Sequence, residues 1–251
     1  MLTAERRRAI LGQLEQDGKV VSSQLVASLG VSEDTVRRDL HSLAVEGLLQ
    51  RVHGGALPAA APNAARPFST RLEIAHEAKV ALAEAALPLL AGARLIVLDG
   101  GTTSLELARR LPAGHRCTVV TNAPPIAVAL SAHPSADVVL VGGRLLKDDQ
   151  VTVGSTATEA LHSVRADVCV LGVCSLHPDI GVMTLDHDEA EVKRAMVASA
   201  GEVIALATAD KLRSTSPWVV ARLSDIDHLV TDGDAELTGP YTTSGIDVVS
   251  A

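Results

Sequence analysis

The chain has 251 residues and a net charge of −8, and 47% of its residues are hydrophobic, which suits one or two domains with sizeable cores. It has no apolar run of roughly 18 residues and no secretory signal pattern, so we expect a cytoplasmic protein that does not use a membrane. Only three residues are aromatic, too few for the stacking surfaces of RNA and single-strand binders. The three cysteines lack the spacing of zinc ligands, and we expect neither a metal nor a cofactor.

The first 30 residues predict two short helices. Apolar residues at helical spacing mark residues 3–16, and Gly18 is a typical residue at a helix end. After a short extended piece, Ser22 is expected to cap a second helix. Gly30 then predicts a tight turn into the next element.

Residues 32–43 predict a helix with one apolar face and one cationic face. Ser32 is a good N-cap, and apolar residues recur at i, i+4 and i+7 from Val36. Arg37 and Arg38 lie off that stripe and are expected to point outward. Acidic residues four positions earlier could pair with both arginines, at about 0.2–0.5 kcal/mol each, in which case the arginines only keep a surface helix soluble.

Residues 48–57 predict a hairpin, because the pair Gly54-Gly55 lies between two apolar runs. Arg51, His53 and the exposed backbone N–H groups of the glycines suit contact with phosphate. A short helix, a glycine turn, a capped helix with outward arginines and a hairpin form the layout of a winged helix-turn-helix.

This unit resembles the winged helix-turn-helix of the DeoR-type bacterial repressors over residues 1–57. The matching residues are Arg6, Ile10, Leu14, Ser32, Thr35, Val36, Arg37, Arg38, Asp39, Leu40, Arg51, His53, Gly54, Gly55 and Ala56. The resemblance implies that double-stranded operator DNA is a partner. The implied DNA contacts are Ser32, Glu33, Thr35, Arg37, Arg38, Arg51, His53, Gly54 and Gly55. An arginine can bond both guanine acceptors at once, whereas Asp39 is expected to brace an arginine inside the unit.

A proline-rich stretch separates this unit from the rest of the chain. Residues 58–67 contain three prolines and no hydrophobic period, so we expect a domain at 1–57, a linker at 58–70 and a second domain at 71–251. Residues 1–57 contain seven basic and seven acidic residues, so the remainder carries the whole charge of −8. An acidic body argues against general polyanion binding and predicts strong salt dependence at a local DNA site.

The second domain predicts a parallel sheet. After a helical stretch from residue 68 to residue 90, six apolar runs each end abruptly in Gly, Asp, Thr or Asn, and helical stretches separate most of them. The runs cover residues 95–98, 118–120, 138–141, 168–171, 203–207 and 228–230, and the helices 103–111, 124–132, 156–163 and 188–199. This alternation is typical of an α/β, Rossmann-like domain whose strands are buried on both faces.

Ligands bind such sheets beyond the carboxyl ends of the strands. Residues 100–103, Gly-Gly-Thr-Thr, follow the first strand and begin a helix, whose free N–H groups and dipole suit an anion. An ordinary tight turn is the alternative. Lys211 could pair with a phosphate or could be a simple surface lysine. Lys193 lies within a helix, where Glu189 four residues earlier could pair with it.

This half of the chain resembles the sugar-phosphate sensor domain of the same regulators over about residues 75–232, a domain similar in fold to ribose-5-phosphate isomerases. The matching residues are Asp99 to Thr103, Thr121-Asn122, Gly142-Gly143, Leu171-Gly172, Glu189-Ala190, Lys193 to Met196 and Asp210-Lys211. The effector pocket that the resemblance implies is lined by Asp99, Gly100, Gly101, Thr102, Thr103, Asn122, Gly143, Lys193 and Lys211. The chain departs from the family pattern at Gly100, where Ser is usual, at Cys174, near a place where glycine is common, and at Asp210 and Lys211, which are adjacent.

We therefore expect a transcriptional regulator, a repressor of a carbohydrate-metabolism operon that leaves its operator when a phosphorylated sugar binds. Two DNA half-sites suit a two-fold protein, so we expect a homo-oligomer, either a dimer or a tetramer. The alternative is a sugar-phosphate isomerase-like enzyme with an appended DNA-binding unit. Its general base would be Asp99, Glu189 or Asp210, but none has a recognisable acid–base partner in the sequence, and no catalytic residue is predicted.

Overall fold

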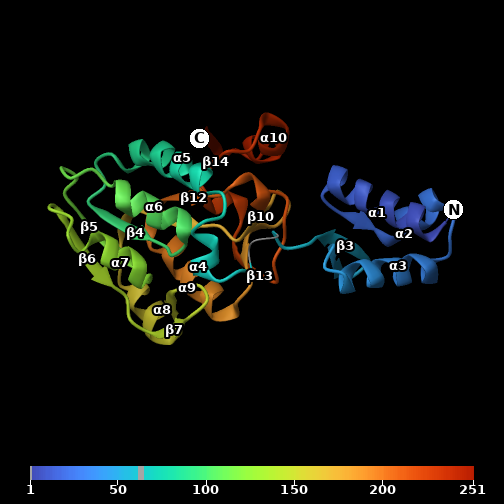
Figure 1. The fold of residues 1–251 in the computed structure, drawn as a ribbon, viewed down its shortest axis with the longest axis horizontal. Helices are drawn as coiled ribbons and strands as arrows, with labels where there is room; N and C mark the ends of the chain where they lie inside the picture. Colours follow the sequence, from blue (N-terminus) through green and yellow to red (C-terminus); the bar gives the residue numbers. More distant parts are fainter. Residues whose placement is uncertain (1, 62–64) are drawn as a thin grey trace.

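The computed structural model describes residues 2–61 and 65–251, and it has a small lobe and a large lobe (Figure 1). Each lobe has its own cluster of buried apolar side chains. At the ends of the predicted linker, Pro58 belongs to a strand of the small lobe and Phe68 is buried in the core of the large lobe, and residues 62–64 fall outside the described residues. Over the described ranges, no helix combines the length and apolar character that a membrane crossing needs.

The small lobe is the winged helix-turn-helix that the sequence predicts. It consists of α1 (Thr3–Asp17), α2 (Ser22–Leu29), α3 (Glu33–Val45) and a three-stranded antiparallel sheet. The strands lie in the order β1 (Val20–Val21), β3 (Gly55–Pro58) and β2 (Leu49–Val52). Its core contains Ile10, Leu25 and Val36, all without exposed surface.

The start of α2 differs from the prediction at Ser22. The cap position is Val21, which has no side-chain cap, and Ser22 is already the first helical residue. Val21 is paired with Gly55 in the sheet, so the chain passes directly from strand to helix. The backbone N–H of Ser22 donates to the carbonyl of Gly54 at 2.7 Å, which satisfies one of the N–H groups that lack a helical partner at the start of a helix.

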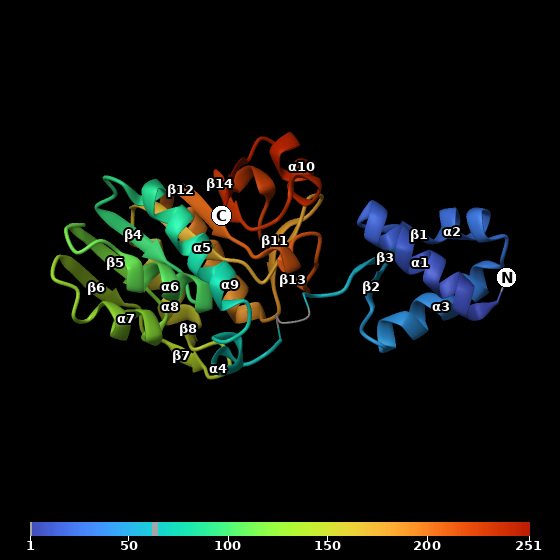
Figure 2. The ribbon, with the colours of Figure 1, turned by 45° about the horizontal axis from the view of Figure 1, so that its top comes forward.

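The large lobe contains a seven-stranded, wholly parallel sheet, which confirms the α/β prediction and its six strands. In spatial order the strands are β15 (Asp247–Ser250), β14 (His228–Thr231), β12 (Ala200–Leu206), β9 (Ala166–Gly172), β4 (Leu95–Leu98), β5 (Cys117–Thr121) and β6 (Ala136–Leu140). The seventh strand, β15, was not predicted. Figure 2 shows the sheet with the helices around it, among them α6 (Thr102–Arg110), α7 (Pro124–Leu130), α8 (Ser155–His162), α9 (His187–Ala198) and α10 (Ala235–Thr243).

The strand order reverses between β4 and β9, at the centre of the sheet. From β4 the chain adds β5 and β6 on one side, and from β9 it adds β12, β14 and β15 on the other. The connections that follow β4 and β9 therefore diverge, which opens a crevice at the carboxyl ends of these two strands.

The predicted helix over residues 68–90 is broken into three pieces, α4 (Phe68–Arg71), α5 (His76–Ala86) and the 3₁₀ turn η1 (Leu87–Leu90). The break before α5 is at Ala75, whose φ of 49° is left-handed. The ammonium of Lys79 donates to the carbonyls of Arg71 and Ile74, so a side chain takes up acceptors that a continuous helix would satisfy itself. Helical periodicity cannot reveal such a bond.

The short strands of the large lobe that lie outside its main sheet were not predicted. They form the hairpin β7 (Arg144–Leu146) and β8 (Val151–Val153), and a small antiparallel sheet of β10 (Ser175–His177), β11 (Gly181–Thr184) and β13 (Trp218–Ala221). The 3₁₀ turn η2 (Ala209–Lys211) follows β12, and η3 (Leu223–Asp225) follows β13. Both short sheets lie beside the carboxyl ends of the main strands, next to the candidate site.

Candidate functional sites

The recognition helix α3 begins as predicted. Ser32 has an extended backbone, and its side chain accepts a bond from the N–H of Thr35 at 3.3 Å. Val36 and Leu40 are buried in the small lobe. This docking leaves the opposite face of α3 free to carry polar side chains.

The cationic face of α3 is exposed. The side chains of Arg37 and Arg38 are 73% and 77% exposed. Arg38 pairs with Asp34 four residues earlier, as the alternative interpretation expected, and Arg37 lies 3.5 Å from the same carboxylate, three residues earlier. The hydrogen bond from Arg38 lowers the pKa of Asp34. Because the pairs lie in water, they can open at little cost when phosphates or bases approach.

Asp39 braces the unit from inside, as predicted. Asp39 is buried and forms a bidentate ion pair with Arg6 of α1. Nη2 of Arg6 lies 3.1 Å from Oδ1 of Asp39. The hydrogen bond to Asp39 raises the pKa of Arg6. The pair joins α1 to the recognition helix and therefore fixes the direction in which α3 presents its arginines.

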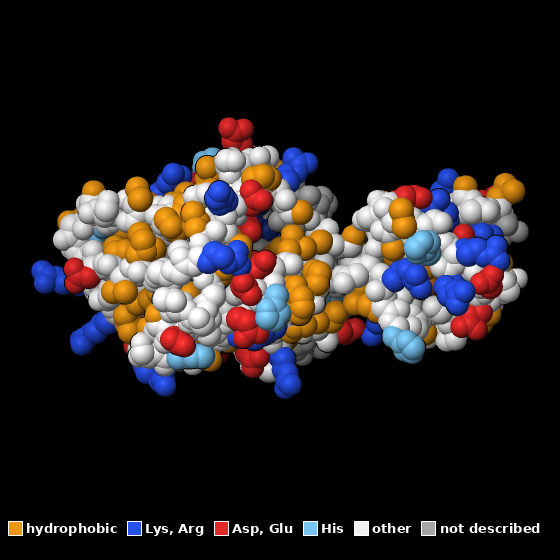
Figure 3. All heavy atoms as spheres, turned by 90° about the horizontal axis from the view of Figure 1, so that it is seen from below, with side chains coloured by type: hydrophobic (Ala, Val, Ile, Leu, Met, Phe, Trp, Pro, Cys, Tyr) orange, Lys and Arg blue, Asp and Glu red, His pale blue; other side chains and the backbone are white. Residues whose placement is uncertain are grey.

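The wing lies next to the recognition helix. Arg51 Nη1 lies 3.5 Å from Nδ1 of His41 on α3, and Arg51, His53 and Gly54 are exposed. Gly55 differs from the prediction of an exposed N–H, because it is buried and a Cβ there would lie 1.9 Å from the carbonyl oxygen of Val20. Figure 3 shows Lys, Arg and His side chains gathered on one face of the small lobe.

The large lobe has a cavity at the predicted end of the sheet. Its free volume is about 70 Å³, and it lies at the carboxyl ends of β4, β9 and β12. The lining residues are Arg71, Ile74, Ala75, Lys79, Gly100 to Ser104, Asp149, Val151, Gly172 to Cys174, Glu189, Lys193, Leu206, Thr208, Asp210 and Lys211. The structure thus brings together the predicted residues 100–103, Lys193 and Lys211.

The Gly-Gly-Thr-Thr loop lets the backbone approach the cavity closely. A Cβ at position 100 would lie 2.1 Å from Cγ1 of Val151, so only glycine fits below the β7–β8 hairpin. Gly101 has a φ of 121°, which side chains rarely adopt, and it directly precedes α6. Thr102 and Thr103 are the first helical residues, so their N–H groups lack helical partners and face the region where an anion binds best.

Besides Lys193, three cationic side chains line the same cavity. They are Arg71 of α4, Lys79 of α5 and Lys211 of η2. Burial and the positive charges of Lys211 and Arg71 lower the pKa of Lys79 to about 8. Burial also lowers the pKa of Lys211, and the nearby Asp210 opposes this shift. Cations that depress one another's pKa are stabilised when an anion enters between them.

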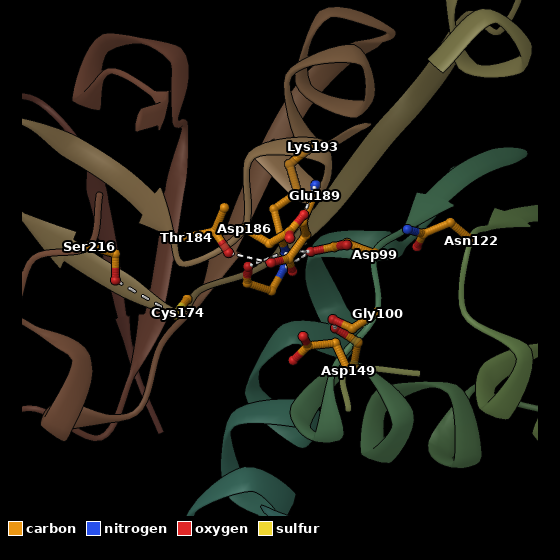
Figure 4. Close-up of polar contacts among 12 residues, drawn as sticks. Asp99, Gly100, Asn122, Asp149, Cys174, Thr184, Asp186, Glu189, Lys193 and Ser216 are labelled. Atoms are coloured by element: carbon orange, nitrogen blue, oxygen red, sulfur yellow. Dashed lines mark hydrogen bonds and ion pairs between the residues drawn. The ribbon is translucent and has the colours of Figure 1, made fainter. Parts of the chain in front are cut away.

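Lys193, which lines the cavity, forms an ion pair with Asp99, which lies beneath it (Figure 4). Their side chains are 5% and 1% exposed, and Asp99 also accepts from the N–H of Gly172 at 2.9 Å. Lys193 further donates to the carbonyl of Gly172 and lies 3.4 Å from Glu189, the pairing that was its alternative role. Burial alone would lower the pKa of Lys193, but the carboxylates of Asp99 and Glu189 outweigh it and raise the pKa. Asp99 supports the cavity but does not line it.

Asn122 and Gly143 also lie outside the cavity lining. The side-chain amide of Asn122 donates to the carbonyl of Thr152 at 3.0 Å, and Thr152 Oγ1 donates to the carbonyl of Val141 at 2.6 Å. A Cβ on Gly143 would lie 2.6 Å from the carbonyl oxygen of Val153. The unpredicted hairpin β7–β8 therefore covers the ends of β5 and β6, and the site is confined to the neighbouring strands.

The sequence interpretation missed Arg71, Lys79 and Asp149. Arg71 Nη2 donates to Asp149 Oδ1 at 2.8 Å, and its Nε is buried with no bonding partner among the described residues. Burial and the charge of Glu189 raise the pKa of Asp149. The only sequence signal was a pair of cations eight residues apart in one predicted helix, a spacing that equally fits a solvated face.

Two family models match this chain. A model described as a DeoR-like helix-turn-helix domain matches residues 6–59, and one described as a DeoR C terminal sensor domain matches residues 74–233. The second match covers the strands and loops that line the cavity.

Relatives match over nearly the full chain. An "HTH-type transcriptional regulator GlpR" from Haloferax volcanii is 35% identical over 99% of this chain and 98% of its own length. An "HTH-type transcriptional repressor GlcR" from Bacillus subtilis is 35% identical over 92% of this chain and 89% of its own. The solved ribose 5-phosphate isomerase of Methanocaldococcus jannaschii covers 54% of each chain at 12% identity with a TM-score of 0.39, a likeness too low to support any function.

Proposed function

The chain belongs to the DeoR family of transcriptional regulators, and on that premise we propose that it represses a carbohydrate-metabolism operon and leaves the operator when a phosphorylated sugar binds. The observation that carries the proposal is the cavity that Arg71, Lys79 and Lys211 line together with the start of α6. The proposal places the protein in the cytoplasm, where its operator DNA lies.

A phosphate group suits this cavity better than a neutral ligand. It offers three acceptor oxygens and a charge near −2, which match three cations and the unpaired N–H groups at the start of a helix. The carboxylates of Asp149 and Glu189 also line the cavity and can accept bonds from sugar hydroxyls. A site with cationic and acceptor groups together favours a molecule that carries both a phosphate and hydroxyl groups.

DNA binding in the proposal falls to α3 and the wing. Arg37 and Arg38 would reach base edges or phosphates in the major groove, and Arg51, His53 and the Gly54 backbone would contact the flanking phosphates. Ser32 and Thr35 at the start of α3 are further proposed phosphate contacts, and Glu33 could accept from a cytosine amino group.

We further propose a homo-oligomer, a dimer or a tetramer, because an operator with two half-sites requires two recognition helices. The edge strand β6 supports the proposal, since it has an open side and its Val139 and Leu140 are 49% and 47% exposed. Sedimentation equilibrium tests this point, and a monomer at the concentrations used for DNA binding would exclude it.

The enzyme alternative receives no support from its three carboxylates. Asp99 lies beneath the cavity in the ion pair with Lys193, and Glu189 accepts a bond from Thr184. Asp210 accepts from Thr208 Oγ1 at 2.6 Å. Each carboxylate thus has a structural partner, whereas a general base needs a substrate proton within reach.

Paired substitutions test the two halves of the proposal separately. Arg37→Ala and Arg38→Ala should weaken binding to the DNA upstream of this protein's own gene. Arg165→Ala is the control, because Arg165 is an exposed residue of the large lobe that, among the described residues, bonds only to nearby backbone carbonyls. Lys211→Ala should keep DNA affinity and lose the response to sugar phosphates. Unchanged DNA affinity in both α3 variants would refute the recognition role, and an unchanged response would remove Lys211 from the site.

A further inference from the structure

In the described part of the chain, two buried residues of the large lobe form hydrogen bonds with the small lobe, and each lies a few residues along the chain from the cavity. Thr215 Oγ1 donates to the carbonyl of Pro58 at 2.5 Å, and Thr215 is four residues after the cavity residue Lys211. His177 Nε2 lies 2.9 Å from the carbonyl oxygen of Gly18, and His177 is three residues after the cavity residue Cys174. Thr215 and His177 are each 1% exposed.

Thr215 contacts both strands of the wing. Pro58 is the last residue of β3, and Thr215 Oγ1 also lies 3.0 Å from Oε1 of Gln50 in β2. The backbone N–H of Thr215 lies 3.4 Å from the carbonyl oxygen of Ala59. One side chain of the large lobe therefore fixes the base of the hairpin whose tip is proposed to contact DNA.

His177 contacts the end of α1, and its tautomer follows from its neighbours. The N–H of Asp179 donates to Nδ1 at 3.2 Å, so Nδ1 is an acceptor without a proton. Nε2 therefore carries the proton and donates to the carbonyl of Gly18. Gly18 caps α1 in the left-handed conformation, with a φ of 69°. An exposed ion pair between Lys19 and Asp179, at 2.7 Å, lies beside this contact. The turn of the β10–β11 hairpin thus holds the small lobe at a second place.

The two contact segments are bonded to each other. Leu176 forms a parallel bridge with Leu212, and the hydroxyl of Tyr241 donates to the carbonyl of Leu176 at 2.9 Å. The same hydroxyl accepts from the N–H of Arg213 at 3.0 Å, and Ser216 Oγ lies 2.7 Å from Ser175 Oγ. Tyr241 has no exposed surface, so these bonds are shielded from water. Residues 211–216 and β10 therefore form one connected body between cavity and wing.

We infer that Thr215 and His177 are positioning residues, which set the orientation of the DNA-binding unit according to whether the cavity is occupied. The inference rests on the proposed function for the existence of an effector. A ligand that draws Lys211 toward its phosphate moves the start of the 211–216 segment, and the bond from Ser214 Oγ to the carbonyl of Lys211, at 2.7 Å, passes the shift on. Two recognition helices can fit their half-sites only if each keeps a defined orientation, so a small rotation suffices to weaken DNA binding.

The test uses the intact chain and isosteric pairs of variants. Thr215→Val removes the hydroxyl and keeps the shape, whereas Thr215→Ser keeps the hydroxyl. Thr243→Val is the matched control, because Thr243 Oγ1 bonds only its own helix, to the carbonyl of Gly239 at 2.9 Å, among the described residues. His177→Phe removes the donor, and His177→Gln keeps an N–H of similar reach.

Operator affinity is measured by fluorescence anisotropy with and without ribose 5-phosphate, glucose 6-phosphate, fructose 1-phosphate or glycerol 3-phosphate. The factor by which the active compound weakens DNA binding is expected at roughly 5- to 150-fold in the wild type, a common range for coupled sites. It should fall toward one in Thr215→Val and His177→Phe. It should stay near the wild-type value in the Ser, Gln and Thr243→Val variants. A merely structural contact would change DNA affinity or sugar-phosphate affinity and leave this factor unchanged, a result that would overturn the inference.

A second measurement needs no effector. Hydrogen exchange of the intact chain should become faster in Thr215→Val and His177→Phe at the amides of residues 18–21, 55–57 and 59, with no change in the strands of the main sheet. Unaltered exchange at those amides would refute the positioning role even if the wild type responds to no compound. Altered exchange together with an unresponsive wild type would keep the positioning role and refute the proposed effector instead.

Discussion

Lys193, at the wall of the cavity, forms an ion pair with Asp99, and neither side chain is more than 5% exposed. Asp99 directly follows β4, and Lys193 lies on α9. The pair therefore joins the two halves of the sheet next to its topological switch point. Both residues were predicted to contact the effector. Asp99 lies outside the cavity lining and supports the site, whereas Lys193 lines the cavity and holds Asp99 in place.

Removal of one partner should therefore destabilise the large lobe. Lys193→Met leaves the carboxylate of Asp99 buried without its cation, a change that typically costs about 3–5 kcal/mol. Urea denaturation followed by circular dichroism measures the loss of unfolding free energy. Lys147→Met, at an exposed lysine of the same lobe, is the control. An unfolding midpoint for Lys193→Met equal to that of the control would contradict the structural role.

Gly100 should be required for the fit of the β7–β8 hairpin. A Cβ at this position would lie 2.1 Å from Cγ1 of Val151, and overpacking of this kind typically costs about 1–3 kcal/mol. Gly100→Ala should reduce the response to sugar phosphates and leave DNA affinity intact. The double variant Gly100→Ala with Val151→Ala removes the clashing methyl group and should restore part of the response. A double variant no better than the single one would show that the clash is not the cause.

Effector binding should weaken above pH 8. Burial and the charges of Lys211 and Arg71 lower the pKa of Lys79 to about 8, so the protein without ligand loses this proton as the pH rises through that value. A phosphate ester has its second pKa at about 6 and stays doubly charged throughout this range. If binding requires the protonated lysine, affinity falls by up to about tenfold per pH unit above the pKa. Titration calorimetry from neutral to alkaline pH measures this fall.

Lys79→Met supplies the comparison for that titration. The variant should bind more weakly at neutral pH, because one cation is missing, and its affinity should change little across pH 8. A decline as steep as that of the wild type would assign the pH dependence to another group, with Lys211 as the next candidate because burial lowers its pKa too.

The contact between the lobes should loosen in acid. Burial lowers the pKa of His177, the bond to Gly18 and the charge of Asp179 oppose the shift, and Lys19 and Arg213 reinforce it. In a separated form the exposed imidazole would titrate near its ordinary value of about 6.5. The separated form therefore binds more protons between that value and the lowered pKa, and docking weakens as the pH falls through this window. Energy transfer between dyes on the two lobes measures it, and a decrease of equal size in His177→Gln would exclude His177 as the cause.

The parts of the fold that were predicted correctly depend on local signals. Each of the six predicted strands is an apolar run that ends at a polar or glycine residue, and Ser32 and Gly18 mark helix ends through bonds within their own turns. The break at Ala75 was missed because the carbonyls that it exposes are satisfied by Lys79, a bond that arises only once the chain has turned. Local periodicity contains no information on such a bond.

The candidate site was predicted in part for the same reason. Residues 100–103 and Lys211 follow strands and line the cavity together. Asn122 and Gly143 also follow strands, but the hairpin β7–β8 covers them, and its three-residue strands are too short to give a periodic signal. The contacts of Thr215 and His177 join residues more than 150 positions apart, so only the folded chain reveals them.

The central claim is that a sugar phosphate in the cavity lowers the affinity of this protein for its operator. The most direct test is the affinity of the wild-type chain for the DNA upstream of its own gene, by fluorescence anisotropy, with and without the four sugar phosphates named above. We predict specific binding that at least one of these compounds weakens by roughly 5- to 150-fold. Specific binding that none of them changes would contradict the effector assignment, and the absence of specific binding would contradict the regulator itself.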